Sequence, residues 1–467
     1  MTFCGMILAA GKGTRMKSEL PKVLHPIAGR PLLFYPVHAL LEAGAQEVVV
    51  VVGHGKDRIE QMLATYFPDR VVTAFQPEQR GTGHAVACGL AKVTHTQGEL
   101  ALAYGDMPLL SASTFQGLLS LTQTSPALLH MLTTWADSAT GYGRIIRDAS
   151  ASVLEVKEER DCTEVETAIR EVNPGVYMVD LPFIRKAVGN LESNNAQREL
   201  LLTDVVKVAA KQGGVATQTW DFAELQGVND RRDLAACEMR MLRRIAENHA
   251  LRGVTIRDLD SVYIDHEVHI EADATLQNAV VLRGACQIKR GAFIDVGCVL
   301  EDVQVGENAY LKPYTVATQS RIGQEAQLGP FAHVRPRSTI GRRAQIGNFV
   351  ELKSTQVGEG SKANHLSYLG DGDIGDHVNI GAGTIFCNYD GTHKHRTVLE
   401  EGVFVGSDSQ FVAPIKVGKN AYVGTATTVT VDVPEGALAI GRVRQVNKPG
   451  YAAELRKRLR RTKADDR

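Results

Sequence analysis

An aliphatic residue recurs at every sixth position through the C-terminal half of the chain. A period of six fits neither an α-helix, which repeats near 3.6 residues, nor a lone amphipathic strand, which repeats at two. It fits a parallel β-helix, in which each six-residue step forms one side of a prism and the aliphatic side chain points inward. More than twenty positions obey this rule, with short slips of phase and one interruption at residues 387–398: Ile264, Ile270, Leu276, Leu282, Ile288, Ile294, Leu300, Val305, Leu311, Ile322, Leu328, Val334, Ile340, Ile346, Leu352, Val357, Ala363, Leu369, Ile374, Ile380, Phe386, Leu399, Val405, Phe411, Val417, Val423 and Val429.

The N-terminal half follows a different pattern, because short apolar segments alternate there with segments of helical spacing. Strands are expected at Met6–Ala10, Val48–Val52, Val71–Phe75 and Leu100–Tyr104, and helices at Pro31–Ala43 and Thr82–Lys92. Strands that alternate with helices predict an α/β domain with a largely parallel sheet.

Two further helices are expected outside these halves. Apolar residues from Leu234 to His249 lie three or four positions apart, which predicts one long amphipathic helix over 231–251 that ends before Gly253. The expected organisation is therefore a first domain at 1–228, a linker helix at 229–252 and a solenoid domain at 253–467. The tail Leu455–Lys463 carries six basic residues, so it is either a solvated terminal helix or a phosphate-binding arm.

Composition excludes several classes of function. The chain has 467 residues and a formal net charge of −1, which gives no general attraction to nucleic acid. The apolar run Val48–Val52 is far short of the ~20 residues that span a bilayer, so no membrane insertion is expected. The N-terminal MTFCGMILAA lacks the positive start of a signal peptide. Seven scattered cysteines without a CxxC pair predict reduced thiols and a cytoplasmic location: Cys4, Cys88, Cys162, Cys237, Cys286, Cys298 and Cys387.

A glycine-rich loop follows the first expected strand and is suited to phosphate. Gly11 and Gly13 allow a tight turn whose N–H groups can face phosphate oxygens, and Lys12, Arg15 and Lys22 add positive charge. The loop is not a P-loop, because Gly13 follows Lys12 where Ser or Thr would stand. It is not a dinucleotide fingerprint either, because Met16 replaces the third glycine. On the loop alone, a turn with solvated basic residues remains an alternative.

Two later segments strengthen the nucleotide interpretation. Residues 76–85 form a second glycine-containing loop that opens a helix, and Tyr104-Gly105-Asp106 ends a buried strand, where α/β folds place ligand contacts. Asp106 is a candidate Mg²⁺ ligand, since Mg²⁺ takes oxygen ligands and uses one or two carboxylates together with phosphate. The alternative is an Asp that caps the next segment.

A second group of polar residues lies in the expected solenoid. Arg335 and Lys353 suit a sugar phosphate. His365 could act as a general base, because imidazole titrates near neutral pH, although a solenoid histidine can also be structural. A metal site that uses His333, His365 and His377 is a further alternative. Tyr368, Asn379, Asn388 and Tyr389 complete the group.

The first set of motifs resembles the sugar nucleotidyltransferases. With the hexapeptide half attached, nearly the whole chain resembles the bacterial family of bifunctional N-acetylglucosamine-1-phosphate uridyltransferase / glucosamine-1-phosphate acetyltransferase. The resemblance implies a Rossmann-like nucleotidyltransferase domain followed by a left-handed parallel β-helix. It also implies a nucleotide and nucleotide-sugar site made by Leu8, Ala9, Ala10, Gly11, Arg15, Lys22, Gln76, Gly81, Thr82, Tyr104, Gly105, Asp106, Gly143, Glu158, Asn173 and Asn229, with Mg²⁺ on Asp106 and Asn229.

The same resemblance implies an acetyltransferase site in the solenoid. His365 would be the catalytic base, and Arg335, Lys353, Tyr368 and Asn379 would bind glucosamine 1-phosphate. Acetyl-CoA would contact Ala382, Asn388, Tyr389, Ser407, Thr425 and Arg442. The chain departs from the family pattern at Pro174, Arg337 and Thr425, where Thr, Gly and Ala are usual.

The resemblance thus predicts a cytoplasmic homotrimer that acts on small molecules. Acetyl transfer from acetyl-CoA to glucosamine 1-phosphate would come first. Uridyl transfer from UTP to N-acetylglucosamine 1-phosphate would follow, with release of pyrophosphate, to supply cell-wall and outer-envelope precursors. One alternative is a single-activity sugar nucleotidyltransferase whose β-helix only oligomerises or regulates. Another is a nucleotide-sugar sensor or scaffold.

Overall fold

The computed structural model describes residues 3–193 and 195–465 and divides into two compact units. The first unit runs to Asn248 and includes Tyr263–Glu267, and the second holds His249–Val262 and the chain from Val268 onward. The division at residue 248 falls inside the helix that was expected to link the domains. Within the described residues, no helix has the length and apolar character needed to cross a membrane.

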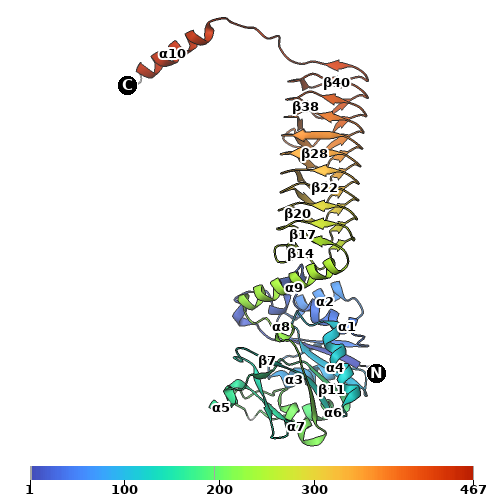
Figure 1. Cartoon of the computed structure of the whole chain (residues 1–467), viewed down its shortest axis with the longest axis vertical. Helices are drawn as coiled ribbons and strands as arrows, with labels where there is room; N and C mark the ends of the chain where they lie inside the picture. Colours follow the sequence, from blue (N-terminus) through green and yellow to red (C-terminus); the bar gives the residue numbers. More distant parts are fainter. Residues whose placement is uncertain (1–2, 194, 466–467) are drawn as a thin grey trace. The chain divides into compact units, whose positions relative to one another are not determined.

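The first unit is built on a ten-stranded sheet (Figure 1), whose order is β5-β4-β1-β6-β11-β7-β10-β8-β9, with β12 beside β7. The four strands from β5 to β6 are parallel to one another, whereas β11, β10, β8 and β9 enter antiparallel pairs. The sheet strands are β1 (Phe3–Ala9), β4 (Val48–Val52), β5 (Val71–Phe75), β6 (Glu99–Tyr104), β7 (Leu129–Trp135), β8 (Gly143–Arg147), β9 (Val153–Lys157), β10 (Glu171–Asn173), β11 (Tyr177–Asp180) and β12 (Val215–Thr219). A hairpin of β2 (Pro26–Ile27) and β3 (Arg30–Pro31) lies outside this sheet.

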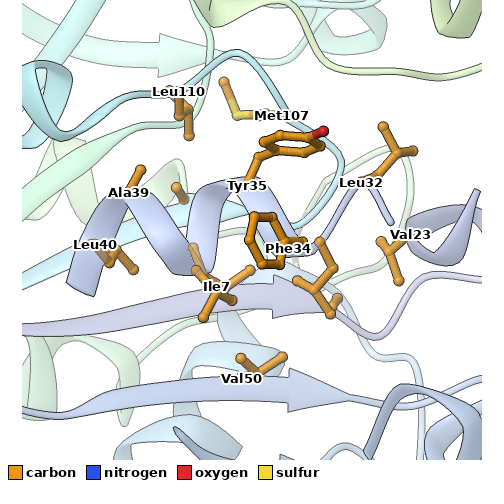
Figure 2. Packing of buried hydrophobic residues seen from close by; sticks show 14 of the residues in the cluster. Ile7, Val23, Leu32, Phe34, Tyr35, Ala39, Leu40, Val50, Met107 and Leu110 are labelled. Atoms are coloured by element: carbon orange, nitrogen blue, oxygen red, sulfur yellow. The ribbon is translucent and has the colours of Figure 1, made fainter. Parts of the chain in front are cut away.

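Helices cover this sheet on both sides. The helices of the first unit are α1 (Phe34–Glu42), α2 (Lys56–Tyr66), α3 (Thr82–Leu90), α4 (Ala112–Thr124), α5 (Glu164–Thr167), α6 (Leu181–Val188), α7 (Asp204–Gln212) and α8 (Phe222–Leu225), with short 3₁₀ turns at Thr14–Met16, Lys22–Leu24 and Glu159–Asp161. The run of five valines in β4 is buried throughout, because Val48, Val50 and Val52 pack in one core and Val49 and Val51 in the other. A parallel strand covered on both faces needs such a continuous apolar run. Figure 2 shows one of these cores, where Phe34 and Leu40 of α1 lie over Ile7 of β1.

The long helix α9 (Arg231–Leu251) has the predicted bounds and precedes Gly253, whose φ is +95°. Its buried residues Cys237 and Met241 belong to the core of the first unit. The helix was expected to act as an arm between domains, but most of it packs as part of the first unit. The tail forms α10 (Tyr451–Asp465), and its side chains are exposed from Tyr451 to Arg460.

The second unit is a stack of short parallel strands in three sheets, as expected for a left-handed parallel β-helix (Figure 1). The first sheet contains β13 (Thr255–Ile256), β16 (Thr275–Leu276), β19 (Phe293–Ile294), β22 (Tyr310–Leu311), β25 (Gln327–Leu328), β28 (Gln345–Asn348), β31 (Lys362–His365), β34 (Asn379–Ile380), β37 (Phe404–Val405), β40 (Tyr422–Val423) and β42 (Leu438–Ala439). The second contains β17 (Val281–Arg283), β20 (Val299–Glu301), β23 (Val316–Thr318), β26 (His333–Val334), β29 (Glu351–Lys353), β32 (Tyr368–Gly370), β35 (Ile385–Cys387), β38 (Gln410–Val412) and β41 (Thr428–Val429), whereas β14 (Tyr263–Ile264) is grouped with the first unit. The third contains β15 (His269–Ile270), β18 (Gln287–Ile288), β21 (Gln304–Val305), β24 (Arg321–Ile322), β27 (Thr339–Ile340), β30 (Gln356–Val357), β33 (Gly372–Ile374), β36 (Thr397–Leu399) and β39 (Ile415–Val417).

The six-residue repeat sets the interior of this prism, since every aliphatic position predicted from the repeat is buried. One further position, Ala317, is also buried between Leu311 and Ile322. It was not among the predicted positions because the phase of the repeat slips between Leu311 and Ile322. The corners of the prism hold residues with left-handed backbone, among them Tyr314, Phe331, Phe349 and Leu366, whose φ values lie between 47° and 59°.

Candidate functional site

The first cavity lies at the carboxyl ends of the parallel strands, where open α/β sheets bind ligands. Its volume is about 290 Å³. The end of β1 and the loop after it contribute Leu8–Gly11, the segment after β5 contributes Gln76 and Gln79, and Gly81 and Thr82 begin α3. Gln79 donates from Nε2 to the carbonyl of Ala10 at 2.7 Å, so the two loops hold each other in place. The remaining lining residues are Lys22, Val23, Ala85, Tyr104, Asp106 and Glu199.

A second cavity of about 260 Å³ adjoins the first, because Tyr104 and Asp106 line both. It is bounded largely by the antiparallel part of the sheet. The other lining residues are Arg15, Met107, Thr140, Gly141, Tyr142, Gly143, Glu158, Asn173, Pro174, Gly175, Thr203, Gly227 and Asn229. The two cavities together hold every residue predicted for the first site except Gly105, which lies between two lining residues and donates its N–H to the carbonyl of Leu8 at 3.0 Å.

Two charge-assisted contacts lie among the residues that line the cavities. The ammonium of Lys22 contacts the carboxylate of Asp106. The guanidinium of Arg15 donates from Nη2 to Oδ1 of Asn229 at 2.8 Å. The oxygens of Asp106 and Asn229 therefore both face positive groups, and a carboxylate with an amide carbonyl is an oxygen donor set that suits Mg²⁺.

The floor of the second cavity is rigid. Tyr104 is packed so closely that a Cβ on Gly175 would lie 2.1 Å from its ring, and Gly175 has a φ of +87°. Asn173 donates from Nδ2 to the hydroxyl of Tyr177 at 2.7 Å and accepts from the Gly175 N–H at 3.1 Å. Burial raises the pKa of both tyrosine hydroxyls above their ordinary value, so both remain neutral donors.

Glu158 is the acidic group of this cavity besides Asp106. Burial raises the pKa of its carboxyl, although Thr203 opposes the shift by donating from Oγ1 to Oε1 at 3.0 Å. A half-buried carboxylate held by a hydroxyl can accept a hydrogen bond from a sugar hydroxyl or amide. The cavity is therefore polar at its far wall and positively charged where it meets the first cavity.

The residues predicted for the second site lie in the solenoid around one corner. His365 ends β31, is exposed, and places Nδ1 2.9 Å from Oδ1 of Asn348 in the neighbouring coil. Backbone hydrogen bonds join this corner to the same corner of the coils that follow. The Gly383 N–H donates to the carbonyl of His365, and the Asp408 N–H donates to the carbonyl of Ala382. Ala426 N–H donates to the carbonyl of Ser407 in the same way, so His365, Ala382, Ser407 and Thr425 stand in successive coils. Arg442 donates from Nη1 to the carbonyl of Thr425 at 2.8 Å.

The residues predicted to bind the sugar phosphate occupy the two faces that flank this corner. Arg335 donates from Nη1 to Glu351 at 2.8 Å, and Glu351 pairs in register with Tyr368 on the second sheet. Asn379 lies on the first sheet, in register with Lys362. Within one chain, therefore, Tyr368 and Asn379 belong to different faces of the prism.

The loop at 387–398 supplies a second positive group beside Lys353. The side chain of Lys394 lowers the pKa of the Lys353 ammonium, while Asp371 opposes that shift. Asn388 donates from Nδ2 to Asp371 at 2.6 Å, and Tyr389 is exposed with its hydroxyl donating to the carbonyl of Gly391 at 2.6 Å. Two neighbouring ammonium groups mark a place that favours an anion.

Comparisons with known proteins cover nearly the whole chain. Residues 5–163 match the model of the MobA-like NTP transferase domain, and residues 259–329 match that of the GMPPB C-terminal domain. The bifunctional protein GlmU of Sorangium cellulosum is 54% identical over 460 residues, which is 97% of each chain. The same protein of Trichlorobacter lovleyi is 45% identical over 97% of this chain and 98% of its own length, and that of Brevibacillus brevis is 44% identical over 96% and 97%. This chain belongs to the GlmU family.

Membership of the GlmU family confirms the resemblance drawn from the motifs. These GlmU relatives are named bifunctional and match both halves, which confirms a two-activity enzyme over the single-activity alternative.

Several residues of the GlmU sites were not predicted from the sequence. Gln79, Glu199 and Thr203 line the cavities, and Lys394 lies beside Lys353. Gln79 is part of the quoted second glycine loop, so its position in that loop was a usable signal. Glu199 and Thr203 stand in an irregular segment between α6 and α7, where no strand end or glycine loop marks a site.

Proposed function

We propose that the chain makes UDP-N-acetylglucosamine in two steps. The solenoid site transfers acetyl from acetyl-CoA to glucosamine 1-phosphate. The site on the sheet then transfers uridyl from UTP to N-acetylglucosamine 1-phosphate and releases pyrophosphate. The observation that supports this most is the pair of adjoining cavities that share Tyr104 and Asp106, because one can hold the nucleotide and the other the sugar with the reacting phosphates between them.

Uridyl transfer needs positioning and charge neutralisation rather than a protein nucleophile. An oxygen of the sugar phosphate attacks the α-phosphorus of UTP in line as pyrophosphate leaves. Lys22 and Arg15 stand where the cavities meet and stabilise the charge on the phosphate oxygens. Asp106 and Asn229 fit a divalent metal, which when bound would neutralise further phosphate charge. In the first cavity Gln76, Gly81 and Thr82 contact the base, and in the second Gly143, Glu158 and Asn173 hold the N-acetylglucosamine.

In acetyl transfer, we assign His365 as the base that takes the proton from the amine as its nitrogen attacks the thioester. The ring is exposed, and Asn348 orients it through Nδ1. When Nδ1–H donates to Asn348 Oδ1, Nε2 is left as the basic nitrogen. The line of Ala382, Ser407 and Thr425 extends from His365 along the same corner and gives acetyl-CoA an extended groove.

The acetyl site is completed by other copies of the chain, and we propose a homotrimer. Tyr314, Phe331, Phe349 and Leu366 form an apolar column directly below and beside His365, with 51%, 48%, 55% and 61% of their surfaces exposed. The three aromatic rings stack at 5.3 and 5.5 Å between centroids. A continuous exposed apolar column of this kind marks an interaction surface. A neighbouring prism on this column would bring further side chains to His365, and the loop at 387–398 can reach it.

Phe331→Asp tests the assembly, because a carboxylate in the middle of the column would repel a neighbouring prism. The variant should sediment as a smaller species and lose acetyl transfer while it keeps uridyl transfer. Val431→Asp is the matched control, because Val431 lies outside the column and 75% of its surface is exposed. This variant should remain trimeric. A Phe331→Asp variant that stays trimeric with full acetyl transfer would overturn the placement of the interface on this column but not the two activities.

The two activities are tested by measuring pyrophosphate release and CoA-thiol release separately on the full chain. Both should appear with the stated substrates. Pyrophosphate release alone would indicate a single-activity nucleotidyltransferase, and neither product would indicate a binding protein. Both substrates and all seven free cysteines suit the bacterial cytoplasm, where the product would supply cell-wall and envelope precursors.

A further inference from the structure

Three potential metal ligands meet at the edge of the sheet opposite the cavities. Cys4 stands at the amino end of β1, Glu47 directly precedes β4, and His95 lies in the segment between α3 and β6. Their ligand atoms all lie within 4.8 Å of one another. Cys4 is buried, Glu47 and His95 are half-buried, and none of the three belongs to either proposed active site.

The two distances from Glu47 to the other ligand atoms are close to those around a tetrahedral zinc ion. Zn–S bonds of about 2.3 Å and Zn–N or Zn–O bonds of about 2.0–2.2 Å place the ligand atoms about 3.3–3.6 Å apart. Oε2 of Glu47 lies 3.2 Å from Nδ1 of His95 and 3.9 Å from Sγ of Cys4. These two pairs need to change by only a few tenths of an ångström to share one ion, and the ligand atoms of Cys4 and His95 lie within 4.8 Å of each other.

The imidazole of His95 stands between two acceptors. Its Nδ1 faces Glu47 Oε2 at 3.2 Å, and its Nε2 faces Oε1 of Gln46 at 3.1 Å. A neutral imidazole carries one N–H and can donate to only one of them. A metal ion on Nδ1 removes the conflict, because Nε2–H then donates to Gln46, and a carbonyl oxygen on the second nitrogen is the usual partner of a metal-bound histidine.

The surrounding residues hold the ligands in place. Thr94 donates to Glu47 Oε2 from its N–H at 3.0 Å and from Oγ1 at 3.2 Å. Arg185 in α6 donates to the carbonyls of Leu90, Val93 and His95, each at 2.9 Å, and so fixes the segment that carries the histidine. The charges also match, because a thiolate and a carboxylate together neutralise a divalent ion.

We propose that Cys4, Glu47 and His95 form a zinc-binding site, with the fourth position open to water on the side of His95. Thiolate, imidazole and carboxylate are the ligand types that zinc uses, whereas Mg²⁺ prefers oxygen alone. On binding, the S–H bond of Cys4 breaks as the S–Zn bond forms, and one proton passes to the buffer.

Cobalt(II) is the probe, because it occupies zinc sites and a thiolate ligand gives it a charge-transfer absorption. The full chain is freed of metal and titrated with Co²⁺ in saturating Mg²⁺, which keeps the oxygen site at Asp106 occupied. The expected result is one equivalent of Co²⁺ with a thiolate band, which Zn²⁺ abolishes by displacement. Gln46→Ala should weaken the affinity by about 10–100-fold, because it removes the partner of Nε2–H.

Variants assign the ligands. Cys4→Ala and His95→Ala should each lose the band, whereas Cys162→Ala should retain it as the matched control, since that thiol only approaches the carbonyl of Lys157. Pyrophosphate release verifies that each variant is folded, and His95, which is partly exposed, tests the site even where Cys4→Ala does not fold. A wild-type chain without the band, or a band that survives in His95→Ala, would overturn the proposal and indicate a protonated His95 or another thiol instead.

Discussion

Gly175→Ala probes how rigidly the second cavity is built. Gly175 has a φ of +87°, and an added Cβ would lie 2.1 Å from Cε2 and 2.9 Å from Cδ2 of Tyr104. Two costs are expected. A left-handed alanine costs about 1–2 kcal/mol, and a clash in a packed core that cannot relax costs about 1–3 kcal/mol more. The free energy of unfolding of the first unit should therefore fall by about 2–5 kcal/mol.

Gly141→Ala separates the two costs. Gly141 lines the same cavity with a φ of +84°, yet a Cβ there would meet nothing within 4 Å. Only the backbone cost of about 1–2 kcal/mol applies to it. The entropy that alanine removes from the unfolded chain is the same for both variants and cancels in the comparison.

Urea unfolding followed by tryptophan fluorescence measures the difference. Both tryptophans of the chain, Trp135 and Trp220, lie in the first unit, so the signal reports that unit alone. Gly175→Ala should be the less stable variant by about 1–3 kcal/mol and should lose uridyl transfer, while acetyl transfer continues. Equal stability of the two variants would refute the reasoning, since it would mean that the ring of Tyr104 moves aside freely.

Three further outcomes are expected. Asp106→Asn should reduce pyrophosphate release by at least about 10²–10³-fold and leave CoA-thiol release unchanged; substantial pyrophosphate release at saturating Mg²⁺ would contradict its role. His365→Ala should slow CoA-thiol release by about 10²–10⁴-fold with near-normal acetyl-CoA binding and thermal stability, whereas a structural histidine would show lower stability and near-normal turnover. Burial and the negative charge of Asp180 raise the pKa of the Glu99 carboxyl from 4.5 to about 7. The stability that Glu99 contributes is therefore full below the pKa that it has in the unfolded chain, and it is lost as the pH rises through 7. Glu99→Gln should therefore flatten the decline of the urea midpoint over that interval, and parallel declines in both proteins would rule out this source.

The sequence predicted most of the fold because hydrophobic periodicity carries it. The repeat of six identified the prism, and the continuous valines of β4 identified a strand buried on both faces. The antiparallel half of the first sheet was not foreseen in detail, because β8, β9 and β10 are short and only partly apolar.

The residues of the candidate site also divide into those that the sequence predicts and those that it does not. Residues at strand ends and glycine loops, such as Gly11 and Asp106, were predictable because topology brings the carboxyl ends of parallel strands together. Thr203 was not, since its contact with Glu158 joins positions 45 residues apart through an irregular segment. Lys394 likewise reaches Lys353 from a loop whose path no periodicity describes.

The prism of stacked coils implies that damage to the second unit stays local. Each coil pairs only with the coil before and after it, from β13 to β42. The free energy of such an array is approximately a sum of coil terms and neighbour terms, so unfolding can begin at an end and advance coil by coil. A defect near Val429 would then fray the last coils and release Thr425 and Arg442 while His365 stays in place. The effect of a mutation should accordingly depend on its position along the solenoid axis. Destabilising the last coils should weaken the binding of acetyl-CoA before it displaces His365.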